Sequence, residues 1–435
     1  MKAIQVGLLG LGTVGSGVAL TLEKNREWIE ECVGRPLRIT HALVKNKREY
    51  GHLALPEDLV ITENVRDILD DEDVSLVIEV MGGIHPAREF ILEALRKGKN
   101  VVSANKDLIA AHGPEIVRTA TENGVDFLCE ASVGGGIPIL LPLKKSLTAN
   151  RIEEIAGIVN GTTNYILSAM TEDGLSYEDA LHQAQELGYA EANPAADVGG
   201  LDAARKIAIL ASIAYRANAT LDDVHVEGIE QITARDIQVA GELGYVIKLL
   251  AVAKKMNDGV VLSVHPAFVP VRHPLAAVRG AYNAVYVVGN AVDDVMFYGK
   301  GAGSYPTASA VLGDVMEIAH HINEDICGKN PMLVTDAVAT VADAARWKSP
   351  YYFRLIVKNR PGVLAEISQT FAKHSISIET MRQLGEEVSA ELVMVVYPAE
   401  QRAVDCVRED LASLDSVERV ANCIRVFREI AHEDN

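Results

Sequence analysis

The pattern that most constrains the fold is a glycine-rich turn after an apolar segment at the start of the chain. Residues 4–9, IQVGLL, predict a buried strand, and three glycines in residues 10–15 form the spacing GxGxxG before a helical pattern. In such a strand–turn–helix unit the glycines allow a tight turn, close approach of the backbone to a pyrophosphate, and close packing of helix on strand. We therefore expect a dinucleotide site formed by Gly10, Gly12, Thr13, Val14 and Gly15.

Strand and helix patterns alternate up to about residue 130. Four further apolar segments (LRITHALV, VSLVIEV, NVVSA and VDFLCE) are separated by helical segments. This alternation predicts an α/β domain with a doubly wound, parallel, Rossmann-type sheet over residues 1–130. A long helical pattern, PTASAVLGDVMEIAHHI, lies much later and could complete this domain from about residues 300–330.

The pattern changes after residue 131. Helical segments come first and β-rich runs follow, which predicts a second, α+β domain over residues 131–300, to which we assign catalysis and dimerisation. Residues 350–430 carry strand and helix patterns in the order βαββαβ, which predicts a third, ferredoxin-like unit. A chain of 435 residues is long enough for two or three such domains.

Charge and cysteine content exclude several classes of partner. The net charge of −19 argues against nucleic acid and anionic membranes. No apolar run is long enough to span a membrane, and the first residues enter a strand pattern instead of a signal peptide. The five cysteines are scattered and odd in number, which favours a reducing, cytoplasmic location.

Cofactor choice should be decided at the end of the second strand. An acidic residue there would accept the 2′-hydroxyl of NAD, but this chain has Lys45 and Arg48. Cations suit a 2′-phosphate, which favours NADP over NAD, although a solvated basic loop is the alternative. Ser103 and Lys106 follow the fourth strand, on the sheet edge where ligands bind, so Lys106 could reach the cofactor ribose or the substrate.

Residues 188–206, GYAEANPAADVGGLDAARK, contain the main candidates for catalysis. Asp202 and Lys206 are four residues apart and share one face of a helix, which the apolar continuation IAILASIAY predicts to be buried. A lysine beside carboxylates at the mouth of such a helix could stay protonated and give its proton to a developing alkoxide. An ordinary helical ion pair is the alternative. Glu191 and Asp197 in the preceding loop favour a site for a polar substrate.

These segments, in this order, resemble homoserine dehydrogenases. The motifs are GLGTVG, VVSANK, EASVGGGIP, NGTTNYIL, the 188–206 segment and GKGAGSYPTASAV, and they cover residues 1 to about 325. The third unit, with NRPGVLAEI, resembles an ACT domain, a small amino-acid-sensing module. The resemblance implies NAD(P)-dependent interconversion of L-aspartate 4-semialdehyde and L-homoserine, within threonine, methionine and isoleucine synthesis, by a homodimer or homotetramer.

The resemblance also implies roles for individual residues. Lys206 would be the general acid and base, oriented by Asp202, which also contacts the substrate. Glu191 would hold the substrate ammonium with help from Asp197; an asparagine, Asn193, replaces an aspartate common in this loop. Further substrate contacts would come from Thr162 and Lys106, and further cofactor contacts from Ser103, Lys106, Gly188, Gly301 and Gly303.

A structural monovalent cation, sodium, is implied as well. Its ligands would be the backbone carbonyls of Glu130, Val133, Gly135 and Ile137. Hard cations favour oxygen ligands. A plain strand-to-helix turn is the alternative for this loop.

The ACT resemblance implies an effector loop at Asn359, Gly362 and Val363, with L-threonine as the expected effector. A helix that starts at a glycine offers free N–H groups to a carboxylate. Asn359 stands where an acidic residue is common, and the alternative is a domain that only dimerises.

Two other classes of function remain open. An enzyme of the aspartate-semialdehyde dehydrogenase type needs a cysteine nucleophile, and only Cys129 lies at a suitable strand end, without a histidine beside it. A sensor that binds a dinucleotide and an amino acid without turnover would keep the fold, but the intact Lys206 and Asp202 argue against it. His320 and His321 follow Glu317 with a spacing that can bind metal, and we interpret them as surface or hydrogen-bonded histidines.

Overall fold

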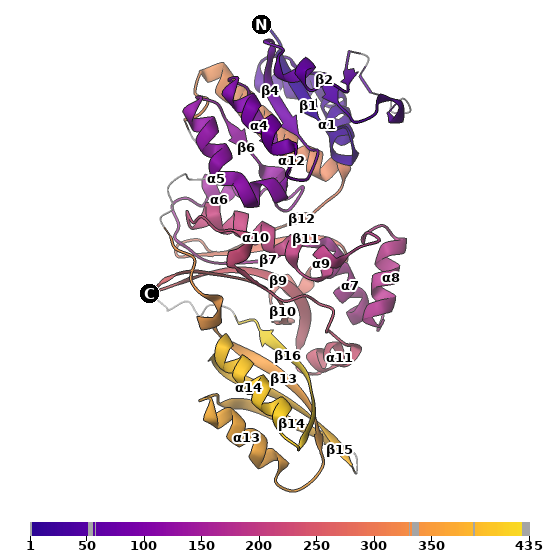
Figure 1. The fold of residues 1–435 in the computed structure, drawn as a ribbon, viewed down its shortest axis with the longest axis vertical. Coiled ribbons are helices and arrows are strands. Elements are labelled where there is room, and N and C mark those ends of the chain that lie inside the picture. The colour runs from indigo at the N-terminus through magenta and orange to yellow at the C-terminus, as the bar shows by residue number, and fades with distance from the viewer. Residues whose placement is uncertain are drawn as a thin grey trace.

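The computed structural model describes residues 2–50, 55–56, 58–329, 331–332, 339–385 and 388–428. Three regions follow one another along the long axis of the molecule (Figure 1). The first holds a six-stranded sheet, all parallel, in the order β3-β2-β1-β4-β5-β6. This order confirms the Rossmann-type sheet. The strands are β1 (Ile4–Leu9), β2 (Leu37–Leu43), β3 (Val60–Thr62), β4 (Val74–Glu79), β5 (Asn100–Ser103) and β6 (Phe127–Leu128).

Helices cover both faces of this sheet, and one of them comes from far along the chain. Helix α12 (Ser304–Glu324) lies beside α1 in the first region (Figure 1). The contact is close: a Cβ added at Gly17 would lie 2.4 Å from the Ser304 Oγ, and this hydroxyl donates to the Thr13 carbonyl at 2.7 Å. The other helices are α1 (Thr13–Lys24), α2 (Arg26–Val33), α3 (Arg66–Leu69), α4 (Ala87–Arg96) and α5 (Lys106–Glu122).

The second region packs helices on a mixed sheet. Its strands are β7 (Ile152–Ile158), β8 (Val224–Val226), β9 (Tyr245–Met256), β10 (Gly259–Pro270), β11 (Tyr282–Gly289) and β12 (Asp293–Lys300). Its helices are α6 (Leu140–Lys144), α7 (Gly161–Glu172), α8 (Tyr177–Glu186), α9 (Ala195–Val198), α10 (Leu201–Ala214) and α11 (Ala234–Glu242). Helix α10 is buried along most of one side, as its apolar sequence predicts, because it packs on β9 and β10.

The third region confirms the βαββαβ order. Its elements are β13 (Lys348–Lys358), α13 (Val363–Lys373), β14 (Ile378–Gly385), β15 (Ser389–Glu400), α14 (Gln401–Ser413) and β16 (Val417–Val426). Its sheet is continuous with that of the second region, because β16 pairs in parallel with β10 through Ala267–Arg425 and Phe268–Val426. The joined sheet has ten strands, with the path β12-β11-β7-β9-β10-β16-β13-β15-β14 and β8 on β10.

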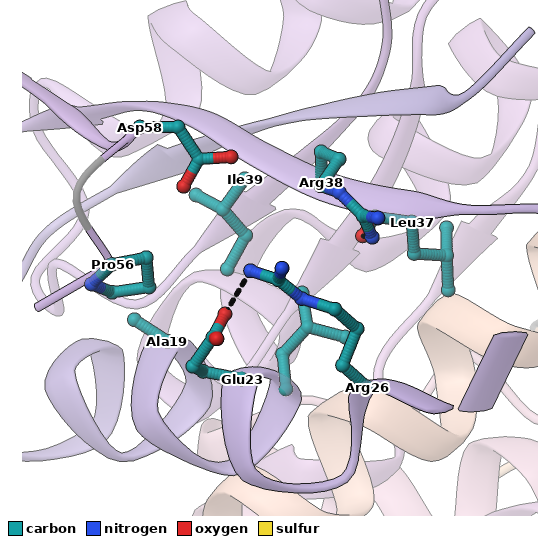
Figure 2. A pocket seen from close by; sticks show the side chains of 9 residues that line it. Ala19, Glu23, Arg26, Leu37, Arg38, Ile39, Pro56 and Asp58 are labelled. Atoms are coloured by element: carbon teal, nitrogen blue, oxygen red, sulfur yellow. Dashed lines mark hydrogen bonds and ion pairs between the residues drawn. The ribbon is translucent and has the colours of Figure 1, made fainter. Parts of the chain in front are cut away.

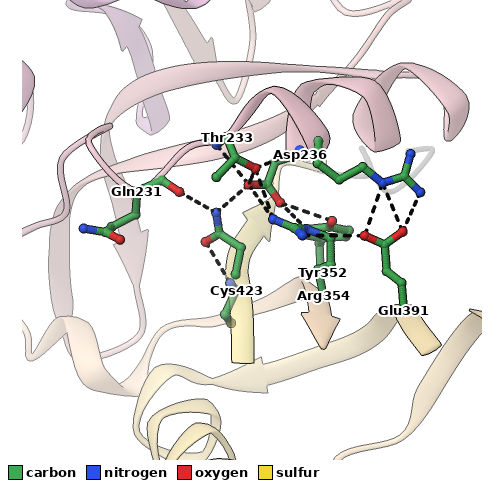
Figure 3. A network of polar contacts seen from close by, with 9 residues as sticks. Gln231, Thr233, Asp236, Tyr352, Arg354, Glu391 and Cys423 are labelled. Carbon is green, nitrogen blue, oxygen red and sulfur yellow. Dashed lines mark hydrogen bonds and ion pairs between the residues drawn. The ribbon is translucent and has the colours of Figure 1, made fainter. Parts of the chain in front are cut away.

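A buried polar network fastens the second and third regions beside this strand pair (Figure 3). Asp236, at the start of α11, is fully buried and accepts a hydrogen bond from Arg354 Nε at 2.8 Å. Its second oxygen accepts from Asn422 Nδ2 at 2.9 Å. Burial alone would raise the pKa of the Asp236 carboxyl, but the bonds from Arg354 and Thr233 outweigh it and lower that pKa. The carboxylate therefore stays ionised within the joint.

In the part of the chain that the structure describes, no helix combines the length and apolar character needed to cross a lipid bilayer.

Candidate active site

The main cleft of the molecule lies between the first and second regions and has a volume of about 1080 Å³. Its walls come from loops after β5 and β6, the start of α7, the loop before α9, the start of α10, and the turn before α12. Lys106, Asp197, Asp202 and Lys206 are its charged groups on the side of α10. Five of the motif segments therefore converge on one cavity, whereas the glycine turn at residues 10–15 is not part of its lining.

Asp202 and Lys206 form a nearly buried ion pair in the first turns of α10. Lys206 Nζ donates to Asp202 Oδ2 at 2.6 Å and to the Val159 carbonyl, also at 2.6 Å. The two side chains are only 11% and 10% exposed, and both line the cleft. The four-residue spacing on a helix produces this pairing, as the sequence predicts. The carbonyl of Val159 fixes the ammonium from a second side.

The carboxylate of Asp202 is shared with a second lysine. Lys106, the first residue of α5, places Nζ 3.3 Å from Asp202 Oδ1. Burial alone would raise the pKa of the Asp202 carboxyl, but the positive charges of Lys206 and Lys106 outweigh it and hold that pKa well below its usual range. Asp202 is therefore ionised at neutral pH.

Asn160 is a site residue to which the sequence had assigned no specific contact. Its amide donates to Asp197 Oδ1 at 2.7 Å and to Asp202 Oδ2 at 2.9 Å. Its own oxygen caps α7 by accepting from the Thr163 N–H at 2.9 Å. Burial raises the pKa of the Asp197 carboxyl, and the hydrogen bond from Asn160 opposes that shift. The motif NGTTN thus serves both as a helix cap and as a bridge between two carboxylates.

The glycine turn has the geometry that its spacing predicts. Gly10 adopts φ +101°, and a Cβ at Gly15 would lie 2.1 Å from the Gly10 carbonyl oxygen. Gly12, the N-cap of α1, has open space where a Cβ would stand. The turn therefore leaves the start of α1, with Thr13 and Val14, free to be approached by a phosphate.

The basic loop after β2 is solvent-exposed. Lys45 and Arg48 are both exposed, and Asn46 caps the short helical turn Lys47–Glu49 by accepting from the Arg48 N–H at 3.2 Å. The loop follows β2, the strand beside β1 and its glycine turn. Two cations are thus available near the site where a dinucleotide ribose would lie in a Rossmann domain.

Ser103 and Glu79 form a buried pair beneath the cleft. The Ser103 hydroxyl is fully buried and donates to Glu79 Oε2 at 2.7 Å. Glu79 also accepts from the Met81 N–H at 2.8 Å, and burial raises the pKa of its carboxyl. The Ser103 hydroxyl therefore faces another side chain instead of the open cleft. The sequence carried no signal for Glu79 beyond its place at the end of β4.

The remaining predicted substrate and cofactor contacts divide between the cleft and its surroundings. Thr162 and Gly188 line the cleft, and the Thr162 hydroxyl donates to the Tyr189 carbonyl at 2.5 Å. Gly188 has φ +75°, a conformation that favours glycine. Glu191 is exposed on the loop between α8 and α9, and it is not among the residues that line the cleft.

Gly301 and Gly303 border the opposite wall. A Cβ at Gly301 would lie 1.9 Å from Asn283 Nδ2, and Gly303 adopts φ +116° at the N-cap of α12. Only glycine fits at the first position without displacing Asn283, which also lines the cleft. The turn thus brings the start of α12 to the cleft, in addition to the starts of α7 and α10.

The loop at residues 130–139 packs against this wall and has the donor set for a hard cation. Val133, Gly135 and Ile137 are buried, and within the described chain their carbonyl oxygens accept no hydrogen bond. The carbonyl of Glu130 accepts one from the Val133 N–H at 3.4 Å. Buried carbonyls need partners, so this oxygen set fits a monovalent cation.

Glu130 also has a role that the sequence did not reveal. Its carboxylate accepts hydrogen bonds from the N–H groups of Ile139, Leu140 and Leu141 at 2.5, 2.8 and 2.7 Å. These N–H groups belong to the first turn of α6, where an anion is stabilised by the helix dipole. The side chain therefore holds the loop closed.

The predicted effector loop lies in the third region, far from the cleft. Gly362 is the N-cap of α13 with φ +97°, and Val363 is the first residue of that helix. The Asn359 N–H donates to the Val388 carbonyl at 2.9 Å. The three residues thus lie together at a helix start.

Two alternatives lose support. Cys129 is completely buried, and burial raises the pKa of its thiol far above the ordinary value, so it is a poor nucleophile. His321 lies between Asp126 and Glu317, with its Nδ1 2.8 Å from the Asp126 carboxylate. No cluster of three or more potential metal-binding side chains occurs among the described residues.

A small pocket between α1 and β2 has too little volume to hold a dinucleotide or a substrate (Figure 2). Its volume is about 20 Å³, and the side chain of Arg26 pairs with Glu23 beside it. The pocket therefore has room for about one water molecule.

The fold and the cleft together define a dinucleotide-dependent oxidoreductase. Comparison with protein families agrees. The model described as "Homoserine dehydrogenase, NAD binding domain" matches residues 10–130, "Homoserine dehydrogenase" matches 138–316, and "ACT domain" matches 351–415.

Individual relatives match most or nearly all of the chain. A homoserine dehydrogenase of Bacillus subtilis (strain 168) is 42% identical over 429 residues, which cover 98% of this chain and 99% of the relative. A crystal structure of a homoserine dehydrogenase from Thiobacillus denitrificans superposes with a TM-score of 0.94 at 42% identity, over 98% of this chain and 99% of that one. A hyperthermophilic archaeal homoserine dehydrogenase in complex with NADPH has a TM-score of 0.62 at 26% identity, over 73% of this chain and 98% of that one.

The chain belongs to the homoserine dehydrogenase family. It is an oxidoreductase that acts on a CH–OH group, with an NAD(P)-binding domain and a C-terminal ACT domain.

Proposed function

We propose that this chain interconverts L-aspartate 4-semialdehyde and L-homoserine with NADP(H), with Lys206 as the general acid and base. The observation that carries this proposal is the position of Lys206 in the cleft, where Asp202 and the Val159 carbonyl hold its ammonium from two sides. We assign the protein to threonine, methionine and isoleucine synthesis, for which L-homoserine would be the intermediate.

In the direction of reduction, a dinucleotide held by the Rossmann-type domain would supply the hydride that the aldehyde carbon receives. Negative charge develops on the substrate oxygen, and Lys206 stabilises it and donates a proton to it. In the opposite direction the neutral amine of Lys206 accepts the hydroxyl proton. Such a group contributes about 10²–10⁴-fold to the rate. Asp202 orients Lys206 and, through its second oxygen, keeps Lys106 at the same place.

The amino-acid end of the substrate needs partners for its ammonium. Asp197 lies in the cleft, and Glu191 lies on the loop just before it. We assign the ammonium to these carboxylates, with Glu191 reaching the cleft when the loop moves onto a bound substrate. Thr162 completes this side at the start of α7.

The choice of NADP rests on the exposed Lys45 and Arg48 after β2. Both would bind a 2′-phosphate there through charge-assisted hydrogen bonds. The similarity to an archaeal relative solved with NADPH supports the same choice.

We also assign a sodium ion to the carbonyls of Glu130, Val133, Gly135 and Ile137. The support is that Val133, Gly135 and Ile137 are buried and that, among the described residues, their carbonyl oxygens accept no hydrogen bond. The ion would brace the loop against the wall that carries Gly301, because a Cβ at Gly135 would lie 2.4 Å from the Gly301 oxygen.

The ACT domain is proposed to sense L-threonine at Asn359, Gly362 and Val363. The start of α13 can hold a carboxylate with its free N–H groups. Threonine should then inhibit the full-length protein, and Asn359→Ala should weaken that inhibition without changing uninhibited turnover. If activity stays constant up to millimolar threonine, the domain would have a dimerisation role only. In either case we propose that the protein is a homodimer or a homotetramer.

The reaction itself is tested by incubating the purified protein with L-homoserine and NADP, then with NAD, and following the absorbance of the reduced cofactor. We expect the cofactor to be reduced only when L-homoserine is also present, and NADP to be reduced faster than NAD. D-homoserine and L-serine are matched controls, since they test the stereocentre and the chain length. Binding of NADP without any reduction would indicate a sensor instead of an enzyme.

A further inference from the structure

A second cavity lies where the catalytic sheet meets the C-terminal unit, away from the main cleft. Its volume is about 170 Å³, which is room for about six water-sized groups. Strands β7, β9, β10 and β16 and the start of β13 contribute to its lining. The apolar part of the wall comes from Trp347, Pro350, Pro398 and Phe427.

Arg425 supplies a buried positive charge to this lining. It is only 2% exposed, and its guanidinium lies over the Trp347 ring, 4.4 Å from the ring centroid. One terminal nitrogen donates to the Ser349 hydroxyl at 3.1 Å and the other to the Gln401 amide oxygen. The third nitrogen, Nε, is buried and has no hydrogen-bond partner.

No carboxylate pairs directly with this guanidinium among the described residues. Asp405 is linked to the guanidinium only through Gln401, whose amide N–H donates to the Asp405 carboxylate at 2.9 Å. Glu227 is bonded to His225 at 2.8 Å, and Glu154 on the cavity wall is paired with Lys254 at 2.6 Å. A buried arginine without a counter-ion and with a free donor favours an anion beside it.

We propose that this cavity binds a small organic carboxylate with a short apolar chain, whose charge Arg425 receives. The carboxylate lies where the guanidinium of Arg425 borders the cavity, and the chain lies against the aromatic and proline side chains. The cavity lies where β10 of the catalytic sheet meets β16 and β13 of the ACT domain. A bound carboxylate would therefore stabilise the contact between the catalytic domain and the ACT domain.

The cavity has a built-in probe. The chain has two tryptophans; Trp28 is 65% exposed, whereas Trp347 is 6% exposed and stacks on Arg425. In a Trp28→Phe protein, the fluorescence of Trp347 reports directly on the cavity. We choose sodium 2-methylpropanoate as the probe ligand and the neutral 2-methylpropanamide, which has the same number of heavy atoms, as its control.

At constant ionic strength, 2-methylpropanoate should change the Trp347 fluorescence along a saturable curve, and the amide should bind at least about tenfold more weakly. Arg425→Gln should abolish the response to the carboxylate. Arg419→Gln, an exposed position on the same strand, should keep it.

No saturable change up to about 100 mM, well above the affinity expected for a ligand of this size, would overturn the proposal. So would equal binding of acid and amide, a comparison that does not depend on whether Arg425→Gln folds. A folded Arg425→Gln protein that still responds to the carboxylate would overturn it as well.

Discussion

Lys106 reaches across the boundary between two domains to Asp202, with Nζ 3.3 Å from Oδ1. It stands at the start of α5, on the sheet edge of the dinucleotide-binding domain, whereas Asp202 belongs to the buried helix α10. Because Lys206 holds the other oxygen, one carboxylate aligns a lysine from each domain. The relative position of the two domains therefore decides whether Lys106 and Lys206 meet at this carboxylate.

Lys206→Ala should lose about two orders of magnitude or more in turnover, because it removes the ammonium that we propose stabilises and protonates the developing alkoxide. Cofactor affinity, measured by fluorescence titration, should stay close to that of the native protein. Lys255→Ala, an exposed lysine on β9, is the control for removing a positive charge. Native turnover in Lys206→Ala would exclude this lysine from the mechanism.

Asp202→Asn should lower the free energy of unfolding at pH 7 by about 3–5 kcal/mol, since it leaves two lysines without their shared carboxylate. The pKa of Asp202 is depressed in the folded state, so its stabilisation is complete above the unfolded-state pKa of about 4 and is lost as the pH falls through the folded-state value. Denaturant unfolding between pH 3 and 7 should show a constant difference from the native protein above about pH 4 and a shrinking one below it. A difference that grows in acid would contradict this sign.

Replacing Lys45 and Arg48 together by alanine should weaken NADP binding by about tenfold to a hundredfold and leave NAD nearly unchanged. The physical reason is the loss of charge-assisted hydrogen bonds to the 2′-phosphate. The measurement is kcat/KM with each cofactor. If the native protein already prefers NAD, the assignment fails before any substitution is made.

Glu191→Gln should raise the KM for homoserine much more than the KM for NADP, because it removes a charge that we assign to the substrate ammonium. Asp197→Asn is the matched comparison, since Asp197 already lies in the cleft and Glu191 does not. A large effect at Asp197 with none at Glu191 would transfer the ammonium to Asp197. An equal rise in both KM values would point to a folding defect.

Arg354→Met should destabilise the protein by about 3–5 kcal/mol, because it leaves the fully buried Asp236 without its cation. The double variant Arg354→Met, Asp236→Asn should recover part of this loss, since an amide can still accept from Thr233 at the start of α11. Equilibrium unfolding in denaturant gives both values. A double variant less stable than Arg354→Met alone would show that the negative charge itself is needed.

Local patterns predicted a large part of this structure. The glycine spacing, the helix that returns from residue 304 and the i,i+4 pair of Asp202 and Lys206 all depend on short-range geometry that the sequence displays directly. The family resemblance added roles that no such pattern contains. The three-residue strand β3 was missed because so short a segment carries no periodicity.

Other features depend on tertiary contacts and have no local signal. The bond from the Ser103 hydroxyl to Glu79 forms only because β4 packs beside β5, and the contact of Ser103 with the cofactor stays a prediction. The joining of two sheets rests on two residue pairs between β10 and β16, more than 150 residues apart. A polar bridge such as Asn160 is likewise visible only when α7, α9 and α10 are placed together.

The shared sheet has a practical consequence for anyone who wishes to exchange the sensory module. A module connected by a flexible tether can be grafted by matching its ends, but here a donor would have to supply a strand that continues β10 in parallel register and a cation at the position of Arg354. Truncation of the chain at residue 348 would leave part of β10 as an unpaired edge, which could pair with strands of other chains. Chimeras in this family should therefore be designed from strand registers and not from domain boundaries.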